Sequence, residues 1–187
     1  FNQPSKSYYF DGGDRLKLDH RGLHGFSEFS ISMWIKINSF DYWPIFLSAA
    51  NDSVDNELLF IPGNTKKFLF KGPTSTQTFV FTDWLNDWKN LTLSKASSSA
   101  PIKVYVDGEL ENSYDFSSSG SLNISSGGLW LGADQDSVGG GWSAGEALNG
   151  WLDDIRFYNR ALSADEVNAT YQVTKFTNVA PSDLSIS

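Results

Sequence analysis

Short apolar runs recur along the chain and are separated by turns about every ten residues. The clearest run is Phe29 to Ile37, in which every second residue from Phe29 is apolar. A period of two is that of a β-strand with one buried face, so we expect this strand to be central in its sheet. Evenly spaced strands and turns are typical of an antiparallel sandwich or jelly roll. The pattern therefore predicts an all-β fold with two sheets.

The other apolar runs predict the remaining strands. Asp107-Gly108 is a strong hairpin signal between two of them. The apolar run 43–47 is followed by a polar stretch, 51–56, which we expect to be a loop before a strand at 57–61. The further predicted strands are 8–10, 16–18, 67–71, 78–82, 88–95, 102–106 and 110–114.

One segment carries the signals of a helix. Ser163 and Glu166 form the Ser-x-x-Glu pattern of a capping box, which predicts a single short helix over residues 163–171. From Thr177 the sequence becomes polar and contains a proline. We therefore expect one jelly-roll domain over residues 1–176 and a linker, 177–187, that leads into a following domain of a larger multidomain chain.

Composition excludes several classes of function. The 187-residue chain has a formal net charge of −8 and no cluster of Lys and Arg, which argues against a nucleic-acid partner. It has no cysteine, so disulfides, thiolate metal sites and a catalytic thiol are excluded. No apolar run approaches the roughly 20 residues that a membrane span requires, so we expect no membrane insertion.

Two histidines stand at a spacing that metal sites use. His20 and His24 are four residues apart, which would place both rings on one face of a helix. Gly22 and Gly25 disfavour a helix at this point. We interpret the pair as two unrelated histidines in a polar loop.

An acidic, glycine-rich loop lies between two predicted strands within residues 129–158 and is the predicted working part of the molecule. Its glycines allow sharp turns that bring side-chain oxygens together. Calcium takes six to eight hard oxygen ligands and tolerates irregular geometry, whereas zinc would require His or Cys, which this loop lacks. The residues that concentrate oxygen ligands here are Asp134, Gln135, Asp136 and Glu146.

Two stretches far apart in the chain carry a family resemblance. Residues 131–140, Leu-Gly-Ala-Asp-Gln-Asp-Ser-Val-Gly-Gly, look like the signature loop of the pentraxins, and residues 55–60, Asp-Asn-Glu-Leu-Leu-Phe, resemble the other half of that family's calcium site. Residues 150–167 and residues 88–108, which close on Val-Tyr-Val-Asp-Gly, are similar to the wider laminin G-like group. The resemblance covers residues 8–171.

The resemblance implies a lectin-like jelly roll whose binding face carries two adjacent calcium ions that contact the ligand directly. Asp134 and Asp136 would be shared by both ions, with Glu146 opposite them in the second site. In the family a carboxylate and an amide occupy the positions that are Ser143 and Glu146 here, so one negative charge has moved. By position, the ligands of the first ion are Asp55, Asn56, Asp134, the backbone carbonyl of Gln135, and Asp136.

The leading hypothesis is a calcium-dependent glycan-binding module. Bound calcium can exchange water for sugar hydroxyls, and aromatic side chains can stack on a sugar ring; Trp142, Trp43 and Tyr42 are the candidates for stacking. Residues 178–185 look like the opening of the cadherin-like repeats of large bacterial adhesins. We therefore expect an adhesion module, extracellular or on the cell surface, whose partners are glycans on a cell or a biofilm.

Two alternatives stay open. A glycoside hydrolase of the same fold needs two carboxylates about 5–5.5 Å or 6.5–9.5 Å apart. No Glu-x-Asp-x-x-Glu run is present, and the adjacent Asp153 and Asp154 are expected to point to opposite faces, so we predict that the chain is not an enzyme. The other alternative is a spacer or protein-binding domain in which calcium is purely structural.

Overall fold

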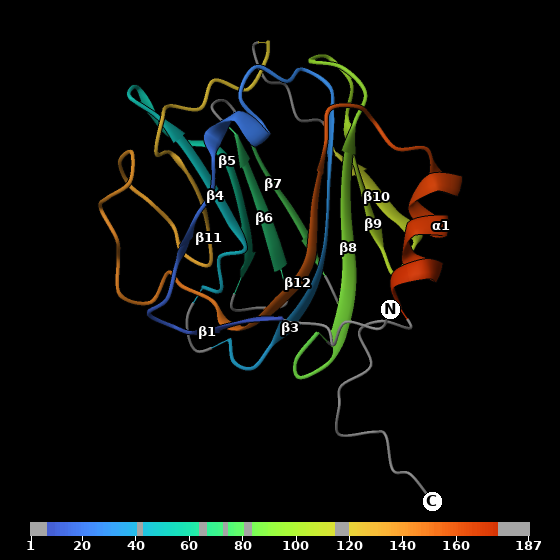
Figure 1. Cartoon of the computed structure of the whole chain (residues 1–187), viewed down its shortest axis with the longest axis horizontal. Helices are drawn as coiled ribbons and strands as arrows, with labels where there is room; N and C mark the ends of the chain where they lie inside the picture. Colours follow the sequence, from blue (N-terminus) through green and yellow to red (C-terminus); the bar gives the residue numbers. More distant parts are fainter. Residues whose placement is uncertain are drawn as a thin grey trace, which may run out of the picture.

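Two six-stranded antiparallel sheets pack against each other in the computed structural model, as Figure 1 shows. The structure describes residues 7–40, 43–63, 67–72, 75–80, 84–114 and 120–175. The strand orders are β1-β12-β3-β8-β9-β10 in sheet A and β2-β11-β4-β5-β6-β7 in sheet B. Strands that are distant in sequence thus lie side by side, as in a jelly roll, and the predicted all-β sandwich is confirmed.

The bounds of the elements follow the predicted order. The strands of sheet A are β1 (Tyr8–Asp11), β12 (Asn149–Tyr158), β3 (Phe29–Ile37), β8 (Trp88–Lys95), β9 (Ile102–Val106) and β10 (Glu109–Tyr114). The strands of sheet B are β2 (Leu16–Lys17), β11 (Leu129–Leu131), β4 (Leu47–Asn51), β5 (Val54–Gly63), β6 (Lys67–Gly72) and β7 (Ser75–Val80). The helices are the 3-10 turn η1 (His20–Gly22) and α1 (Ala164–Thr174).

Four predicted boundaries are wrong. The strand expected from the apolar run 43–47 is β4, which begins only at Leu47, and the helix expected to end at residue 171 continues to Thr174. The other two concern β5 and β7.

The loop expected over residues 51–56 is shorter, because Asn51 Oδ1 accepts hydrogen bonds from the backbone N–H groups of Ser53 (2.8 Å) and Val54 (3.0 Å). The side chain closes a tight turn, and β5 begins at once. Strand β7 begins at Ser75, opposite Gly72 of β6, and not at residue 78 as expected.

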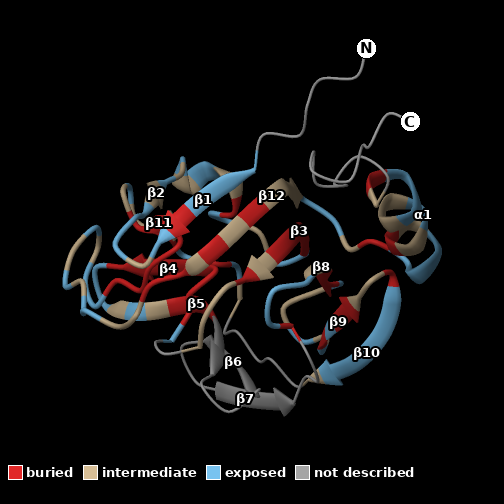
Figure 2. Cartoon of the chain, turned by 90° about the horizontal axis from the view of Figure 1, so that it is seen from below, coloured by how far each residue is buried: buried red, intermediate tan, exposed pale blue. Residues whose placement is uncertain are grey.

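The core lies between the sheets. The apolar positions of β3 pack there against side chains of sheet B such as Leu58 and Leu129. Figure 2 shows the consequence: buried residues run along β3 and β4 in the middle of the molecule, β12 is partly buried, and β10 at the edge of sheet A is exposed. The prediction that β3 is central is confirmed, since β12 and β8 flank it on its two sides.

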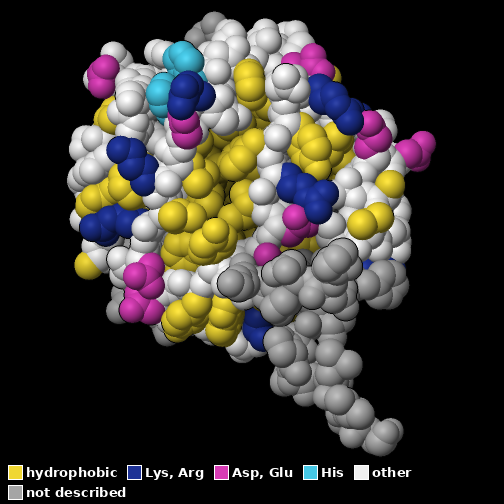
Figure 3. All heavy atoms as spheres, viewed as in Figure 1, with side chains coloured by type: hydrophobic (Ala, Val, Ile, Leu, Met, Phe, Trp, Pro, Cys, Tyr) yellow, Lys and Arg dark blue, Asp and Glu magenta, His cyan; other side chains and the backbone are white. Residues whose placement is uncertain are grey.

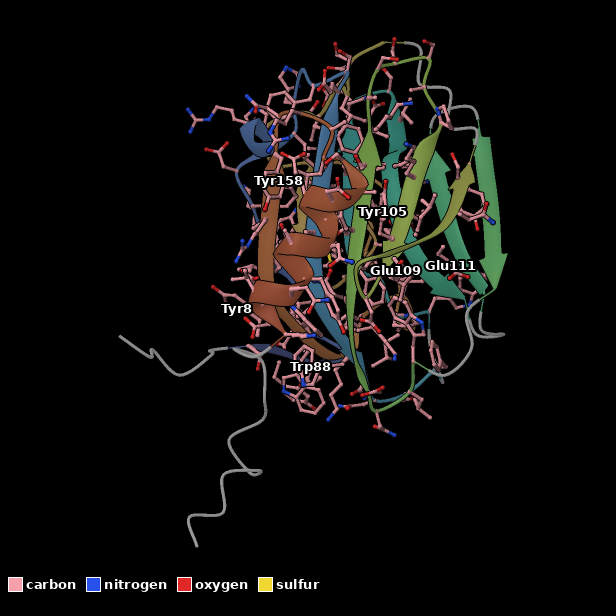
Figure 4. The ribbon with its side chains drawn as sticks, turned by 90° about the vertical axis from the view of Figure 1, so that its right-hand side faces the viewer. Tyr8, Trp88, Tyr105, Glu109, Glu111 and Tyr158 are labelled. Atoms are coloured by element: carbon pink, nitrogen blue, oxygen red, sulfur yellow. The ribbon has the colours of Figure 1, made fainter. Side chains whose placement is uncertain are left out.

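Helix α1 covers the outer face of sheet A, where Figure 4 shows it beside Tyr105 and Tyr158. The predicted capping box is present, because Glu166 N donates to Ser163 Oγ (3.3 Å) and Ser163 N donates to Glu166 Oε2 (2.9 Å). Trp34 on β3 donates its indole N–H to Thr174 Oγ1 of the helix (3.0 Å). Among the helices of the described ranges, none is long and apolar enough to cross a membrane.

Candidate functional site

The acidic loop connects β11 to β12. Its base is closed by backbone hydrogen bonds, with Leu148 N donating to Gly132 O (2.7 Å) and Asp134 N donating to Glu146 O (3.0 Å). Gly132 has φ +87°, and a Cβ there would lie 2.3 Å from the ring of Phe10, so only glycine fits. The closed base fixes Asp134 and Glu146 opposite each other.

Three carboxylates converge in this loop. One oxygen from each of Asp134, Asp136 and Glu146 lies within 4.8 Å of the others. We call these residues the acidic cluster. Asp134 is buried, Glu146 is partly buried and Asp136 is exposed, so the cluster opens to solvent on one side. All donors are hard oxygens, which suits calcium and not zinc.

The electrostatics of the acidic cluster favour a positive charge at its centre. The pKa of Asp134 is raised from its ordinary value of 3.8 to about 6. Burial is the main cause; the charges of Glu146 and Asp136 add to the rise, and hydrogen bonds with Ser48 and the Gln135 backbone oppose it. Ser48 Oγ donates its bond to Asp134 Oδ1 (3.1 Å). A bound cation would remove the cost of these like charges.

Gln135 holds the loop on the outer face of sheet B. Its side-chain amide donates to the carbonyls of Ser48 (3.1 Å) and Gly128 (2.9 Å), and its Oε1 accepts from Gly139 N (2.9 Å). The fully buried side chain is thus engaged by the protein. This arrangement is consistent with the predicted role of Gln135 as a ligand through its backbone carbonyl, which stays a prediction.

The second predicted half of the site, Asp55 and Asn56, begins beside the acidic loop. Asp55 and Asp136 line one cleft of about 420 Å³ together with residues 51–54 and 137–138. Asn56 Oδ1 is buried and has no hydrogen-bond partner in the described part of the chain. A buried amide oxygen without a donor is costly and is the kind of atom that coordinates calcium. The residues present therefore fit a calcium ion.

Sequence reasoning missed one residue that supports this half. Glu57 is buried, and its carboxylate accepts hydrogen bonds from Asn51 Nδ2 (3.0 Å) and from Asn123 N (2.8 Å). These contacts fix the start of β5, where Asp55 and Asn56 lie. A carboxylate inside an otherwise apolar strand was the available signal.

Ser143 contacts the acidic cluster from its exposed side. Its Oγ donates to Asp136 Oδ2 at 3.5 Å, so Ser143 orients a carboxylate of the cluster. Gly141 lies beneath that carboxylate with φ +72°, and a Cβ there would come within 2.8 Å of Asp136 Cβ. Both residues therefore influence where Asp136 points.

The aromatic candidates differ in their surroundings. Trp43 is 38% exposed, and its backbone N–H donates to Gly145 O (2.8 Å), which places it beside the acidic loop. Trp142 is partly buried, with its ring 5.0 Å from that of Trp130. Tyr42 lies outside the described residues. Trp43 is thus the more accessible of the two described candidates.

The remaining candidate residues are placed elsewhere. The rings of His20 and His24 are 5.7 Å apart, but His24 Nδ1 accepts a hydrogen bond from Ile124 N (3.0 Å). Within the described ranges, the acidic cluster is the one group of three or more His, Cys, Asp or Glu side chains that could hold a metal ion. Asp154 pairs with Arg156 Nε (2.7 Å) in an irregular stretch of β12, a structural arrangement.

Comparisons with known proteins agree with the fold. A family model described as the concanavalin A-like lectin/glucanases superfamily matches residues 10–168. C-reactive protein 1.1 of Limulus polyphemus is 28% identical over 149 residues, which are 78% of this chain and 62% of that protein. The chain therefore spans less than two thirds of the length of this relative.

Solved structures share the architecture. A heptameric SAP-like pentraxin from Limulus polyphemus has a TM-score of 0.73 at 17% identity, covering 90% of this chain and 82% of the other. A putative carbohydrate-binding protein from Bacteroides ovatus has a TM-score of 0.67 at 15% identity, covering 88% of this chain and 46% of the other. At such identities the likeness shows the fold, including the pentraxin-like arrangement of the sandwich.

Proposed function

Because the chain belongs to the concanavalin A-like lectin/glucanases superfamily, we propose that it is a calcium-dependent carbohydrate-binding module that serves in adhesion. The observation that carries the proposal is the convergence of Asp134, Asp136 and Glu146, with Asp55 in the same cleft as Asp136. Next to Asp55 in the sequence, Asn56 Oδ1 is buried and has no hydrogen-bond partner among the described residues. Such groups are costly in the folded protein without a cation and become ligands with one.

Two calcium ions would be held by this arrangement. The first ion would be held by Asp55, Asn56 and the Gln135 carbonyl, and the second by Glu146. Both ions would share Asp134 and Asp136. Bound calcium supplies open coordination positions that vicinal sugar hydroxyls can fill in exchange for water. Trp43, exposed next to Gly145, would stack on the sugar ring.

The names of similar proteins support a binding function. One similar structure is described as a SAP-like pentraxin and another as a putative carbohydrate-binding protein. We place the module in a larger multidomain chain, outside the cell or on its surface, where it would bind glycans of another cell or of a biofilm. Residues 1–176 would form the module and residues 177–187 the linker to a following domain.

The first test is calcium binding measured by isothermal titration calorimetry on chelator-stripped protein. We expect two bound ions in the wild type and loss of both in Asp134→Ala, because Asp134 is shared. Glu111→Gln is the matched control, since Glu111 is an exposed carboxylate on β10, in sheet A, and should bind as the wild type does (Figure 4). Absence of calcium binding by the wild type would refute the proposal.

The second test is a glycan array probed in calcium and in chelator. Reproducible hits that disappear in chelator are required by the lectin mechanism. Calcium binding without any glycan hit would favour a spacer with structural calcium. Release of reducing sugar from polysaccharides, lost in Asp134→Ala, would instead identify a glycoside hydrolase.

A further inference from the structure

Two indole rings contact each other beside the acidic loop, and each has a cation near it. Arg15 Cζ lies 4.5 Å from the ring centroid of Trp142, the rings of Trp142 and Trp130 lie 5.0 Å apart edge to face, and Lys17 Nζ lies 6.0 Å from the ring of Trp130. We call these four residues the cation–aromatic row. No sequence pattern reveals it, because its members come from three separate segments.

The row begins at the acidic cluster and crosses the outer face of sheet B. Trp142 immediately precedes Ser143, whose hydroxyl contacts Asp136 of the cluster. Trp130 projects from β11 on the side opposite the core, since its neighbours Leu129 and Leu131 are both buried. Lys17 is the register partner of Trp130 on β2. A ligand bound at the acidic cluster could therefore extend along the row.

The two cations of the row have no acidic partner among the described residues. Within the described ranges, neither Arg15 nor Lys17 makes a salt bridge, although acidic residues outnumber basic ones by 22 to 14 in the sequence. Both side chains are exposed, and each lies near an indole ring instead. Cation–π contacts reduce the freedom of the side chain but leave its charge available for an anion.

A cleft at the end of the row receives one of these cations. Its volume is about 440 Å³, and its lining includes Lys17, His20, Arg21 and the backbone at Gly127. Arg21 is engaged by the carboxylate of Asp19, so Lys17 is the cation in this cleft that is left for a ligand. In Figure 3, Lys and Arg side chains flanked by hydrophobic ones lie on the left, below the two histidines.

We propose that the cation–aromatic row binds the acidic sugar units of an anionic glycan. Arg15 and Lys17 would donate hydrogen bonds to carboxylate or sulfate groups, and the exposed parts of the indole rings would contact the apolar face of the sugar. The assignment rests on the proposed function, since a neighbouring sugar of the same glycan would occupy the calcium site. It adds a ligand class, acidic rather than neutral glycans.

The test compares trigalacturonate with its neutral methyl triester. Affinities are measured by calorimetry with the free calcium concentration held constant, for the wild type and for Lys17→Gln, Arg15→Gln and the double variant. We expect the wild type to prefer the acidic probe and each single variant to weaken that probe about tenfold, as for loss of a hydrogen bond to a charged group. The neutral probe should be unaffected.

The control variant is Lys103→Gln, which removes an exposed cation of β9 in sheet A and should leave both affinities unchanged. The preference for the acidic probe should also shrink in high salt, because exposed charges are screened. An unchanged ratio of acidic to neutral affinity in the Lys17→Gln and Arg15→Gln double variant would overturn the proposal, as would absence of binding of the acidic probe to the wild type.

Asp134→Ala separates this inference from the proposed function. If both hold, Asp134→Ala weakens both probes equally, whereas Lys17→Gln weakens the acidic probe alone. If Asp134→Ala changes neither affinity while Lys17→Gln still removes the preference, the cation–aromatic row binds acidic glycans and the calcium mechanism fails. The opposite result, calcium dependence without any effect of Lys17→Gln, retains the proposed function and refutes the row.

Discussion

The outer faces of the two sheets differ in how their polar groups are satisfied. On sheet A, polar side chains are buried under α1 and the segment that precedes it. Ser30 Oγ, for example, donates to Arg160 O (3.0 Å) and accepts from Leu162 N (2.9 Å). On sheet B, Asn56 Oδ1 has no partner among the described residues, and three carboxylates face one another. Polar groups that are hydrogen-bonded within the protein stabilise the fold, whereas polar groups without a partner are available to bind a ligand.

Removal of the largest contact under α1 should have the greatest effect. Trp34 is 5% exposed, donates to Thr174 and stacks on Tyr171 at 5.7 Å. Trp34→Ala should lower the free energy of unfolding by about 3–5 kcal/mol, the usual cost of deleting a buried Trp. Urea denaturation followed by circular dichroism measures this loss.

The calcium stoichiometry of Trp34→Ala provides the control, because sheet B is untouched. Two ions should still bind at temperatures where the variant is folded. Trp34→Phe, which keeps most of the volume but loses the hydrogen bond, should cost less than the alanine variant. A loss of calcium binding in the folded variant would show that the two faces are coupled.

The opposite result is expected on sheet B. In calcium-free protein at pH 7.5, Asp134→Asn should raise the free energy of unfolding by up to about 2–3 kcal/mol, because the pKa of Asp134 is raised to about 6 and its charge is therefore disfavoured in the folded state. In saturating calcium the wild type should be more stable than Asp134→Asn, since only the wild type is stabilised by bound calcium. Denaturation with and without calcium measures both.

The pH dependence of stability tests whether the charge of Asp134 causes this difference. A folded-state pKa above the unfolded value means that the calcium-free wild type loses stability as the pH rises from about 4 to about 6. The difference between the wild type and Asp134→Asn should therefore shrink toward zero near pH 4. A difference that is the same at pH 4 and pH 7.5 would exclude charge as its cause.

The strands and the three carboxylates of the acidic cluster could be predicted from the sequence, whereas the cation–aromatic row could not. The alternation in β3 and the capping box at Ser163 are local signals, and the structure contains both elements. The start of β5 was missed because the Asn51 side chain closes its turn, a contact that composition does not encode. The row from Arg15 to Trp142 depends on which strands become neighbours, so only the folded structure reveals it.

Calcium affinity should depend on pH through the same carboxylate. Protons compete with calcium at Asp134, whose pKa is about 6 because of its burial and its acidic neighbours. Affinity should be constant above about pH 7 and fall by up to about tenfold per pH unit below 6, as for any ligand that must be deprotonated. Calorimetry from pH 5 to pH 8 measures the profile; a flat profile would exclude Asp134 as a ligand.

The smallest expected effect lies at the start of α1. Ser163→Ala removes the acceptor of the Glu166 N–H bond in the capping box, at a cost of about 1 kcal/mol in the free energy of unfolding. Ser163→Asp, which can still accept that bond, should restore most of the loss in urea denaturation. Neither change should alter calcium affinity, because the cover of sheet A stabilises the sandwich and leaves the oxygens of sheet B to the ligand. A calcium affinity that follows the stability of α1 would mean that the two faces act as one unit.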